Sequence, residues 1–255
     1  MKKAFQITIF VLLALALSGL IYIRLGEQPA ELPQTLELIP LESPSPSPVP
    51  TPSPSPEPFA DKPQIDTTQW NYTLANGSNP LSAEFAPELT AMENGQNFDS
   101  RAADALKEFL AGARQNGLSV YLSSTYRSYK TQEYLFNNKV NQLVWSEGGQ
   151  ENAIAKAKTI VAYPGTSEHQ LGLAADITDR YYETKNESLA DTELSKWMAE
   201  NCADYGFILR YPQDKIDITG VMFEPWHFRY VGQEAAKYIM ENKLCLEEFL
   251  ALYKV

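Results

Sequence analysis

Only two histidines occur in the 255-residue chain, and each lies in a short motif that also carries a carboxylate. The stretch "SEHQLGLAAD" places His169 seven residues before Asp176, and "EPWHFRYVG" places Glu224 three residues before His227. A catalytic zinc site generally needs three imidazole or carboxylate ligands and leaves one position for water. A nearby carboxylate that is not a ligand can take a proton from that water. The motifs therefore point to a metallopeptidase site with Glu224 as the general base.

The residues alone leave a simpler interpretation open. In this interpretation, which considers each histidine on its own, His169 is a surface loop residue and His227 is a hydrogen-bonded residue among core aromatics. The second motif also sets a geometric condition. Pro225 and the aromatic residues favour a strand, on which Glu224 and His227 would point to opposite faces. Glu224 must therefore come from irregular backbone before the strand, where Pro225 prevents regular pairing.

Helical and alternating patterns divide the rest of the globular part into short elements. Asp99 is expected to cap a helix that Gly117 ends, and "LSVYLSSTY" alternates apolar and polar residues like a strand with one buried face. Further helices are expected over 129–145, 151–161, 191–206 and 233–253, and strands over 173–178, 207–212 and 226–231. These elements do not alternate as regular βαβ units, which favours an α+β fold with hairpin-like pairing near the C-terminus.

The N-terminal region predicts a membrane anchor followed by a stalk. Ala4 to Ile23 is a 20-residue apolar run without a charge, preceded by Lys2 and Lys3, and about 20 helical residues span a bilayer. The lysines favour a cytoplasmic N-terminus. A cleaved signal peptide is the alternative, although no convincing cleavage site follows. We therefore expect an anchor over 1–26, with a single N-terminal pass in the cell membrane and the remaining chain outside the cytoplasm.

Composition changes sharply after the anchor. Residues 27–66 hold 12 of the chain's 17 prolines, a composition typical of an extended polyproline II spacer. A proline-rich ligand for a recognition domain is the other interpretation. The globular domain is then expected over 67–255. Its two cysteines, Cys202 and Cys245, could form one disulfide or remain buried thiols, and the sequence leaves both open.

The charge of the chain restricts its partners. A formal net charge of −11 argues against nucleic-acid binding, which normally requires a basic surface. Small molecules or peptides are therefore the expected partners.

Four motifs in this order resemble the VanY-like D-alanyl-D-alanine carboxypeptidases of the M15 zinc peptidase family. They are "SSTYRSYKTQ", "SEHQLGLAAD", "YGFILRYP" and "TGVMFEPWHFRYVG", and they span Ser123 to Gly232. The resemblance covers most of the globular domain and excludes the anchor and the stalk. It implies an α+β fold of the Hedgehog/D-Ala-D-Ala peptidase type, with a small antiparallel sheet and flanking helices.

The resemblance also assigns the site. It implies Zn²⁺ held by His169, Asp176 and His227, with His169 presented from a loop and Asp176 from a strand. Arg127 matches the family's pocket arginine, which binds a substrate oxygen or steadies the developing oxyanion. Two weaker candidates for hydrogen bonds to the peptide are Ser167 and Gln132.

The expected activity is removal of the terminal D-Ala from peptidoglycan stem peptides by an extracellular zinc D,D-carboxypeptidase. Two alternatives stay open. L,D-carboxypeptidases that act on tetrapeptide stems share the same motifs, because the attack on an amide carbonyl is the same chemistry. A non-catalytic cell-wall-binding module would keep the fold, although zinc retention alone would not require Glu224.

Overall fold

The computed structural model describes residue 59 and residues 61–182 and 184–254. The predicted anchor and most of the predicted stalk lie outside these residues. Among the described residues, no helix has the length and apolar character needed to cross a membrane. The last residues of the predicted stalk contact the domain: the Tyr253 hydroxyl donates to the Pro63 carbonyl at 2.7 Å, and Ile65 packs against a buried cluster around α7 (Gln233–Glu241) and α8 (Leu246–Ala251).

A four-stranded antiparallel sheet lies at the centre of the domain, with strand order β3-β4-β6-β5. Its strands are β3 (Tyr121–Ser124), β4 (Ala174–Thr178), β5 (Phe207–Leu209) and β6 (His227–Tyr230). The expected pairing near the C-terminus is present, because β5 and β6 are antiparallel neighbours. A separate two-stranded sheet, which the sequence patterns did not indicate, pairs β1 (Leu89–Ala91) with β2 (Asn97–Asp99).

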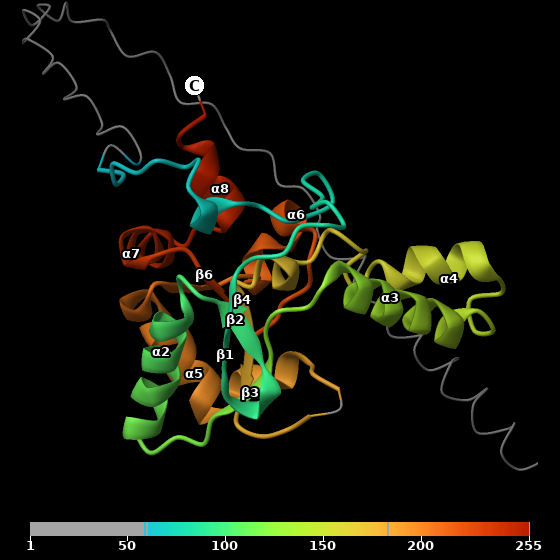
Figure 1. The fold of residues 1–255 in the computed structure, drawn as a ribbon, viewed down its shortest axis with the longest axis horizontal. Coiled ribbons are helices and arrows are strands. Elements are labelled where there is room, and N and C mark those ends of the chain that lie inside the picture. The colour runs from blue at the N-terminus through green and yellow to red at the C-terminus, as the bar shows by residue number, and fades with distance from the viewer. Residues whose placement is uncertain (1–58, 60, 183, 255) are drawn as a thin grey trace, which may run out of the picture. The chain divides into compact units, whose positions relative to one another are not determined.

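Helices surround the sheet (Figure 1). Besides α7 and α8, they are α2 (Ala103–Gln115), α3 (Tyr129–Leu143), α4 (Gln150–Ala157), α5 (Glu193–Asn201) and α6 (Ile216–Thr219). The 3-10 helices are η1 (Trp70–Tyr72), η2 (Glu93–Gly95), η3 (Glu168–Leu171), η4 (Glu187–Asp191), η5 (Cys202–Tyr205) and η6 (Gln213–Lys215). Figure 1 shows α3 and α4 side by side, projecting from the rest of the domain. The two helices share a small cluster of buried apolar residues, Phe136, Val140, Ala153 and Ala157. The α+β prediction is confirmed.

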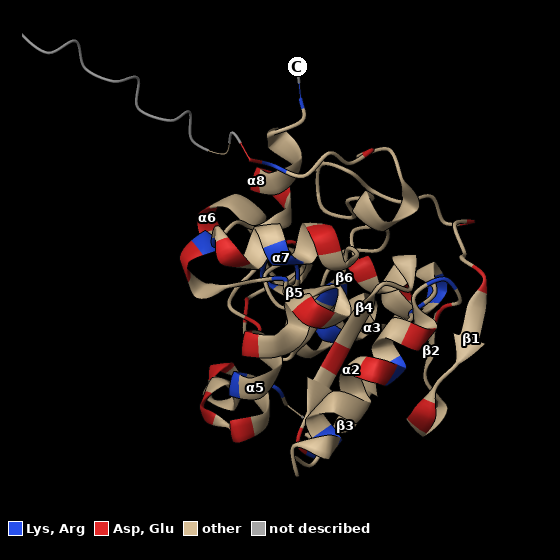
Figure 2. Ribbon diagram, turned by 90° about the vertical axis from the view of Figure 1, so that its left-hand side faces the viewer, with Lys and Arg blue, Asp and Glu red and all other residues tan. Residues whose placement is uncertain are grey.

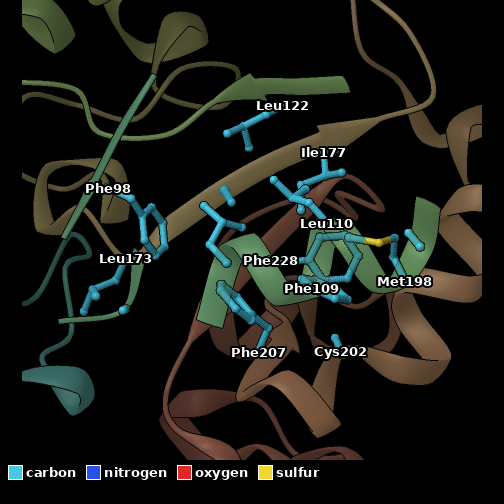
Figure 3. Close-up of a cluster of buried hydrophobic side chains, with 14 of the residues drawn as sticks. Phe98, Phe109, Leu110, Leu122, Leu173, Ile177, Met198, Cys202, Phe207 and Phe228 are labelled. Atoms are coloured by element: carbon cyan, nitrogen blue, oxygen red, sulfur yellow. The ribbon is translucent and has the colours of Figure 1, made fainter. Parts of the chain in front are cut away.

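One face of the sheet is apolar and packs against α2 and α5 (Figure 3). Alternate residues along β4 to β6 supply this face, including Ile177, Phe207 and Phe228, and all three are buried. Phe109 of α2 stacks on Phe207 at a centroid separation of 5.1 Å and meets Phe228 edge-on. Because side chains alternate across a strand, the residues between these apolar ones point to the opposite face of the sheet. That opposite face carries the polar residues of the site.

The predicted helix cap at Asp99 is wrong, because α2 begins at Ala103 and Asp99 ends β2 instead. Its buried carboxylate accepts from the backbone N–H and the guanidinium of Arg101. The local turn therefore competes with helix capping for the same carboxylate. Gly117 follows the helix with φ of 77°, as expected for a glycine that ends a helix.

The predicted closing helix is two helices, α7 and α8. Between them Lys243 adopts φ of 52° and the Leu244 N–H bonds the Ile239 carbonyl, which ends α7. The Glu248 carboxylate accepts from the Cys245 N–H and so starts a new helix. Periodicity alone does not reveal this break, since both helices bury apolar residues on the domain side.

Cys202 and Cys245 are both buried free thiols. Of the two possibilities that the sequence left open, a disulfide or two thiols, the structure therefore shows the two thiols. Figure 2 shows acidic residues along α2, α5 and α7, interspersed with lysine and arginine, as expected for a chain with a net charge of −11.

Candidate metal centre and active-site cleft

Strand register brings two of the predicted ligands together. Asp176 of β4 lies directly opposite His227 of β6, and both face away from the apolar side of the sheet. The His227 Nδ1 atom is 3.2 Å from Asp176 Oδ1. On the other side of β4, Ser124 pairs with Asp176 after a bulge in β3. The end of β3 therefore leads Thr125 toward the same point.

His169 approaches from η3, a single 3-10 turn rather than the expected loop. Gly172 ends this turn at φ of 71°, where a Cβ atom would lie 3.2 Å from the Asp99 backbone nitrogen, so the close packing here favours glycine. The His169 carbonyl accepts from the N–H groups of Arg127 and Gly172. These contacts hold the imidazole in place, with Nδ1 2.5 Å from the Thr125 carbonyl oxygen and Nε2 3.4 Å from Asp176 Oδ1.

The three side chains fit a divalent metal. Ligand atoms of His169, Asp176 and His227 lie within 4.8 Å of one another, and all three residues are buried. Tetrahedral zinc with bonds of about 2.0–2.2 Å places its ligand atoms about 3.3–3.5 Å apart, close to the two separations from Asp176 Oδ1. That oxygen is buried and makes no hydrogen bond among the described residues, whereas Oδ2 accepts from Lys185 at 3.0 Å. Asp176 therefore presents one free oxygen between two imidazoles.

The surroundings of Asp176 and His169 favour the protonation states in which these two residues bind a metal. Burial opposes ionisation of Asp176, but the adjacent His169 and His227 side chains and the Lys185 ammonium outweigh it and hold the pKa of Asp176 well below its usual range. Burial and the nearby Arg127 guanidinium lower the pKa of His169 to about 4. A neutral imidazole and an ionised carboxylate are the protonation states that bind a metal.

Glu224 lies at the mouth of the same group, in the irregular backbone that the sequence required. The His227 N–H bonds the Glu224 carbonyl at 3.1 Å in a turn just before β6. This turn brings Glu224 Oε2 to 3.5 Å from His227 Nδ1, with 27% of the Glu224 side chain exposed. Burial is the main cause that raises the pKa of Glu224 to about 6. A carboxyl group that titrates near neutrality can both accept and return a proton.

Arg127 supplies a cation to the same cleft. The cleft has a volume of about 980 Å³, and its lining includes Arg127, Ser167, Glu224 and the three candidate ligands. Gln132 is 1% exposed and is not among the lining residues. Its Oε1 accepts from Arg127 Nη1 at 2.9 Å, and its Nε2 donates to the Ala162 carbonyl at 2.7 Å. Gln132 thus supports Arg127 from behind, and direct hydrogen bonding to substrate stays a prediction for Gln132 and Ser167.

Sequence reasoning missed the charged residues behind the ligands. Glu168, Arg210 and Arg229 form a buried ion cluster beneath His227, and Lys185 contacts Asp176. Glu168 directly precedes His169, and Arg229 lies two residues after His227. Proximity in sequence alone, however, does not show which side chains point to the same face. The one available signal was alternation along "WHFRYV", which places Arg229 on the same strand face as His227.

Comparison with known proteins places these residues in a family context. Residues 95–233 match the family model described as VanY, D-alanyl-D-alanine carboxypeptidase. A D-alanyl-D-alanine carboxypeptidase of Enterococcus faecalis is 43% identical over 190 residues, which cover 74% of this chain and 69% of the relative.

Solved structures agree with this match. A vancomycin-resistance D,D-pentapeptidase VanY variant in complex with Zn(II) has a TM-score of 0.63 at 41% identity, over 71% of this chain and 99% of the other. VanYB in complex with D-alanine-D-alanine has a TM-score of 0.65 at 41% identity, over 73% and 100%. The LdcB LD-carboxypeptidase has a TM-score of 0.61 at 40% identity, over 71% and 86%.

Proposed function

The chain belongs to the VanY family of D-alanyl-D-alanine carboxypeptidases and is a zinc metallopeptidase, and we propose that it removes the terminal D-Ala from peptidoglycan stem pentapeptides outside the cell. One observation carries this proposal. The unpartnered Asp176 oxygen lies between two imidazoles in a cleft that Glu224 and Arg127 also line. A module that only binds the cell wall would not need this combination of a ligand set, a base and a cation.

The residues of the chain divide the chemistry between them. His169, Asp176 and His227 would hold zinc, which when bound would supply a Lewis acid to polarise the scissile carbonyl and to lower the pKa of the attacking water. Glu224 accepts the proton of the attacking water and then delivers it to the leaving amine of D-alanine. Its pKa of about 6 suits both steps, because neither protonation state is strongly disfavoured near neutrality.

Arg127 provides the positive charge that the substrate requires. Its guanidinium faces the cleft and is fixed by Gln132. A fixed guanidinium binds a carboxylate or stabilises an oxyanion without reorganising during the reaction. We assign Arg127 to bind either the terminal carboxylate of the substrate or the oxyanion that develops at the scissile carbonyl.

The choice between D,D- and L,D-cleavage depends on the fit of the cleft to the stem. Both reactions use the same zinc, base and arginine, so the catalytic residues do not discriminate between them. The resemblance to VanY proteins supports D,D-cleavage, and the likeness to the LdcB LD-carboxypeptidase supports the alternative.

Mass spectrometry of defined muropeptides tests the proposal. Given a pentapeptide stem that ends in D-Ala-D-Ala, the protein should release one D-alanine and accumulate tetrapeptide. Given tetrapeptide alone, it should react slowly. Rapid conversion of tetrapeptide to tripeptide with pentapeptide left intact would instead establish L,D-specificity. The Glu224→Gln variant is the matched control, because it removes the base and keeps the three ligands.

The location outside the cytoplasm is part of the same proposal. Support comes from the apolar run over 4–23, the lysines before it and the proline-rich segment after it. In intact cells stripped of wall, an added protease should degrade the domain, while a cytoplasmic marker protein survives. Protection of the domain until the membrane is permeabilised would contradict this topology. A truncated chain that starts at residue 59 keeps the contacts of Pro63 and Ile65, and it should be active without detergent.

A further inference from the structure

Two buried polar atoms face each other behind the metal centre. His227 Nε2 and Glu168 Oε2 are 3.6 Å apart, with side-chain exposures of 5% and 0%. Neither atom has a hydrogen-bond partner among the described residues. Burying a donor and an acceptor without partners costs free energy, so a partner is expected for each. At 3.6 Å the pair is longer than a hydrogen bond, and a small approach of the two side chains would let each atom satisfy the other.

Two arginines hold Glu168 in position for this contact. Arg210 Nε and Arg229 Nη1 each donate to Glu168 Oε1 at 2.8 Å, so Oε2 is left for His227. Both guanidinium groups are buried and make further bonds of their own. Arg210 binds Glu247 of α8 through two hydrogen bonds of 2.8 and 2.7 Å, and Arg229 Nη2 donates to the carbonyls of Asn71 and Thr73.

This arrangement selects which nitrogen of His227 faces the metal. A carboxylate held by two guanidinium groups accepts hydrogen bonds, so a zinc-bound His227 would carry its proton on Nε2 and would present Nδ1 to the metal beside Asp176. His169 has the opposite arrangement. Its Nδ1 contacts the Thr125 carbonyl, which also only accepts, and Nε2 is left for the metal. The two histidines therefore present different ring nitrogens, each chosen by the group behind it.

We propose that Glu168 is a positioning residue that holds His227 in the Nε2–H form, with Arg210 and Arg229 fixing the orientation of its carboxylate. The competing explanation is that Glu168 only neutralises two buried arginines. The proposal depends on the zinc site and is independent of which peptide bond the enzyme cuts. A wrong assignment of D,D-specificity would therefore leave it intact.

The full-length chain in detergent allows a direct test, because it contains only two histidines and imidazole ¹⁵N NMR resolves each of them. In the zinc-loaded protein we expect Nε2–H at His227, with the deshielded proton of a carboxylate hydrogen bond, and Nδ1–H at His169. Zinc affinity is measured separately by competition with a chelator.

The variant Glu168→Gln separates the two explanations. The amide oxygen of glutamine is drawn to the arginines, so its NH₂ group faces His227 Nε2 and no longer accepts a proton from it. We expect zinc affinity to fall about 10–100-fold, with the His227 resonances shifted and those of His169 unchanged. Glu247→Gln is the matched control, because it removes a partner of Arg210 without touching the Glu168–His227 contact. It should lower stability and leave zinc affinity and both imidazoles unchanged.

Three results would overturn the proposal. The first is folded Glu168→Gln protein with wild-type zinc affinity and an unchanged His227 spectrum. The second is an equal loss of zinc affinity in Glu247→Gln, which would indicate general destabilisation. The third applies even if Glu168→Gln does not fold: an Nδ1–H signal from His227 in the zinc-loaded wild type excludes the contact with Glu168.

Discussion

Two glutamates flank His227 at nearly equal distances and have opposite surroundings. Glu224 Oε2 is 3.5 Å from Nδ1 on the cleft side, and Glu168 Oε2 is 3.6 Å from Nε2 on the buried side. Burial raises the pKa of Glu224 to about 6. Burial acts in the same direction on Glu168, but Arg210 and Arg229 outweigh it and hold the pKa well below its usual range. Two side chains of the same type thus differ in behaviour: Glu224 can exchange a proton near neutral pH, and Glu168 is a permanent anion.

The difference shows that distance to a metal ligand does not define a role. Glu224 is partly exposed and lines the cleft together with Arg127, so it can meet water and substrate. Glu168 has no access to solvent and is held by two fixed cations. A base needs the first set of properties, and a residue that orients a ligand needs the second.

Removing the proton acceptor on the cleft side should have the largest effect. We expect Glu224→Gln to lower turnover of pentapeptide by about 10²–10⁴-fold, the usual contribution of a general base. Zinc should stay bound, because Glu224 is not one of the three proposed ligands. D-alanine release and the zinc content of the purified protein are the measurements.

His169→Ala is the matched comparison for that experiment. It should lose both zinc and activity, since it removes one of the three ligands. If Glu224→Gln also emptied the site while the fold survived, Glu224 would have to be reassigned as a ligand and the contrast between the two glutamates would fail.

The second largest effect is expected for Arg127, the cation that lines the cleft. Arg127→Met should reduce kcat/KM for pentapeptide by about 10²–10³-fold, as expected for loss of one fixed donor to a substrate oxygen. Zinc content should be unchanged. Lys107→Met, which removes an exposed ion pair with Asp104 on α2, is the control and should retain wild-type kinetics. Wild-type kcat/KM in Arg127→Met would remove Arg127 from the site.

On the buried side the expected loss is in stability. Arg229→Met leaves Glu168 with one arginine instead of two, and breaking a buried pair typically costs about 3–5 kcal/mol. We expect a loss near the lower end, because Arg210 remains. Urea unfolding of the zinc-free protein measures it.

An exposed ion pair calibrates this result. Glu93→Gln breaks the partly exposed pair with Arg114 and should cost less than about 1 kcal/mol. Equal losses in the two variants would show that burial adds nothing to the cluster around Glu168.

The smallest effect is expected for the two cysteines, which belong neither to the cleft nor to the buried ion cluster around Glu168. Cys202 and Cys245 are free, so a reductant should leave the thermal midpoint of the purified protein unchanged. A disulfide would typically contribute about 2–4 kcal/mol. A clear fall in the midpoint on reduction would therefore reveal a bond that the structure does not have.

Much of the site was predictable because its chemistry depends on rare residue types. With only two histidines in the chain, each beside a carboxylate, few sets of three ligands are available. The place of Glu224 was also predictable, since Pro225 prevents regular strand pairing and the observed turn before β6 brings Glu224 and His227 together. The helix start at Ala103 and the break at Lys243 were not predictable, because a local turn at Asp99 and a left-handed residue interrupt otherwise continuous helical patterns.

By itself the sequence determined the α+β class and the candidates for the metal ligands and the general base, since residue type, spacing and periodicity are local properties. Only the tertiary structure decided which groups stand behind the ligands. Glu168 lies in η3, Arg210 directly follows β5, and Arg229 lies in β6. Strand register and the packing of α8 bring these three side chains together at one buried point. Whether a carboxylate there is a base or a permanent anion depends on solvent and on cations supplied by distant segments. No local pattern contains that information, because the electrostatic environment of a residue is a property of the assembled fold.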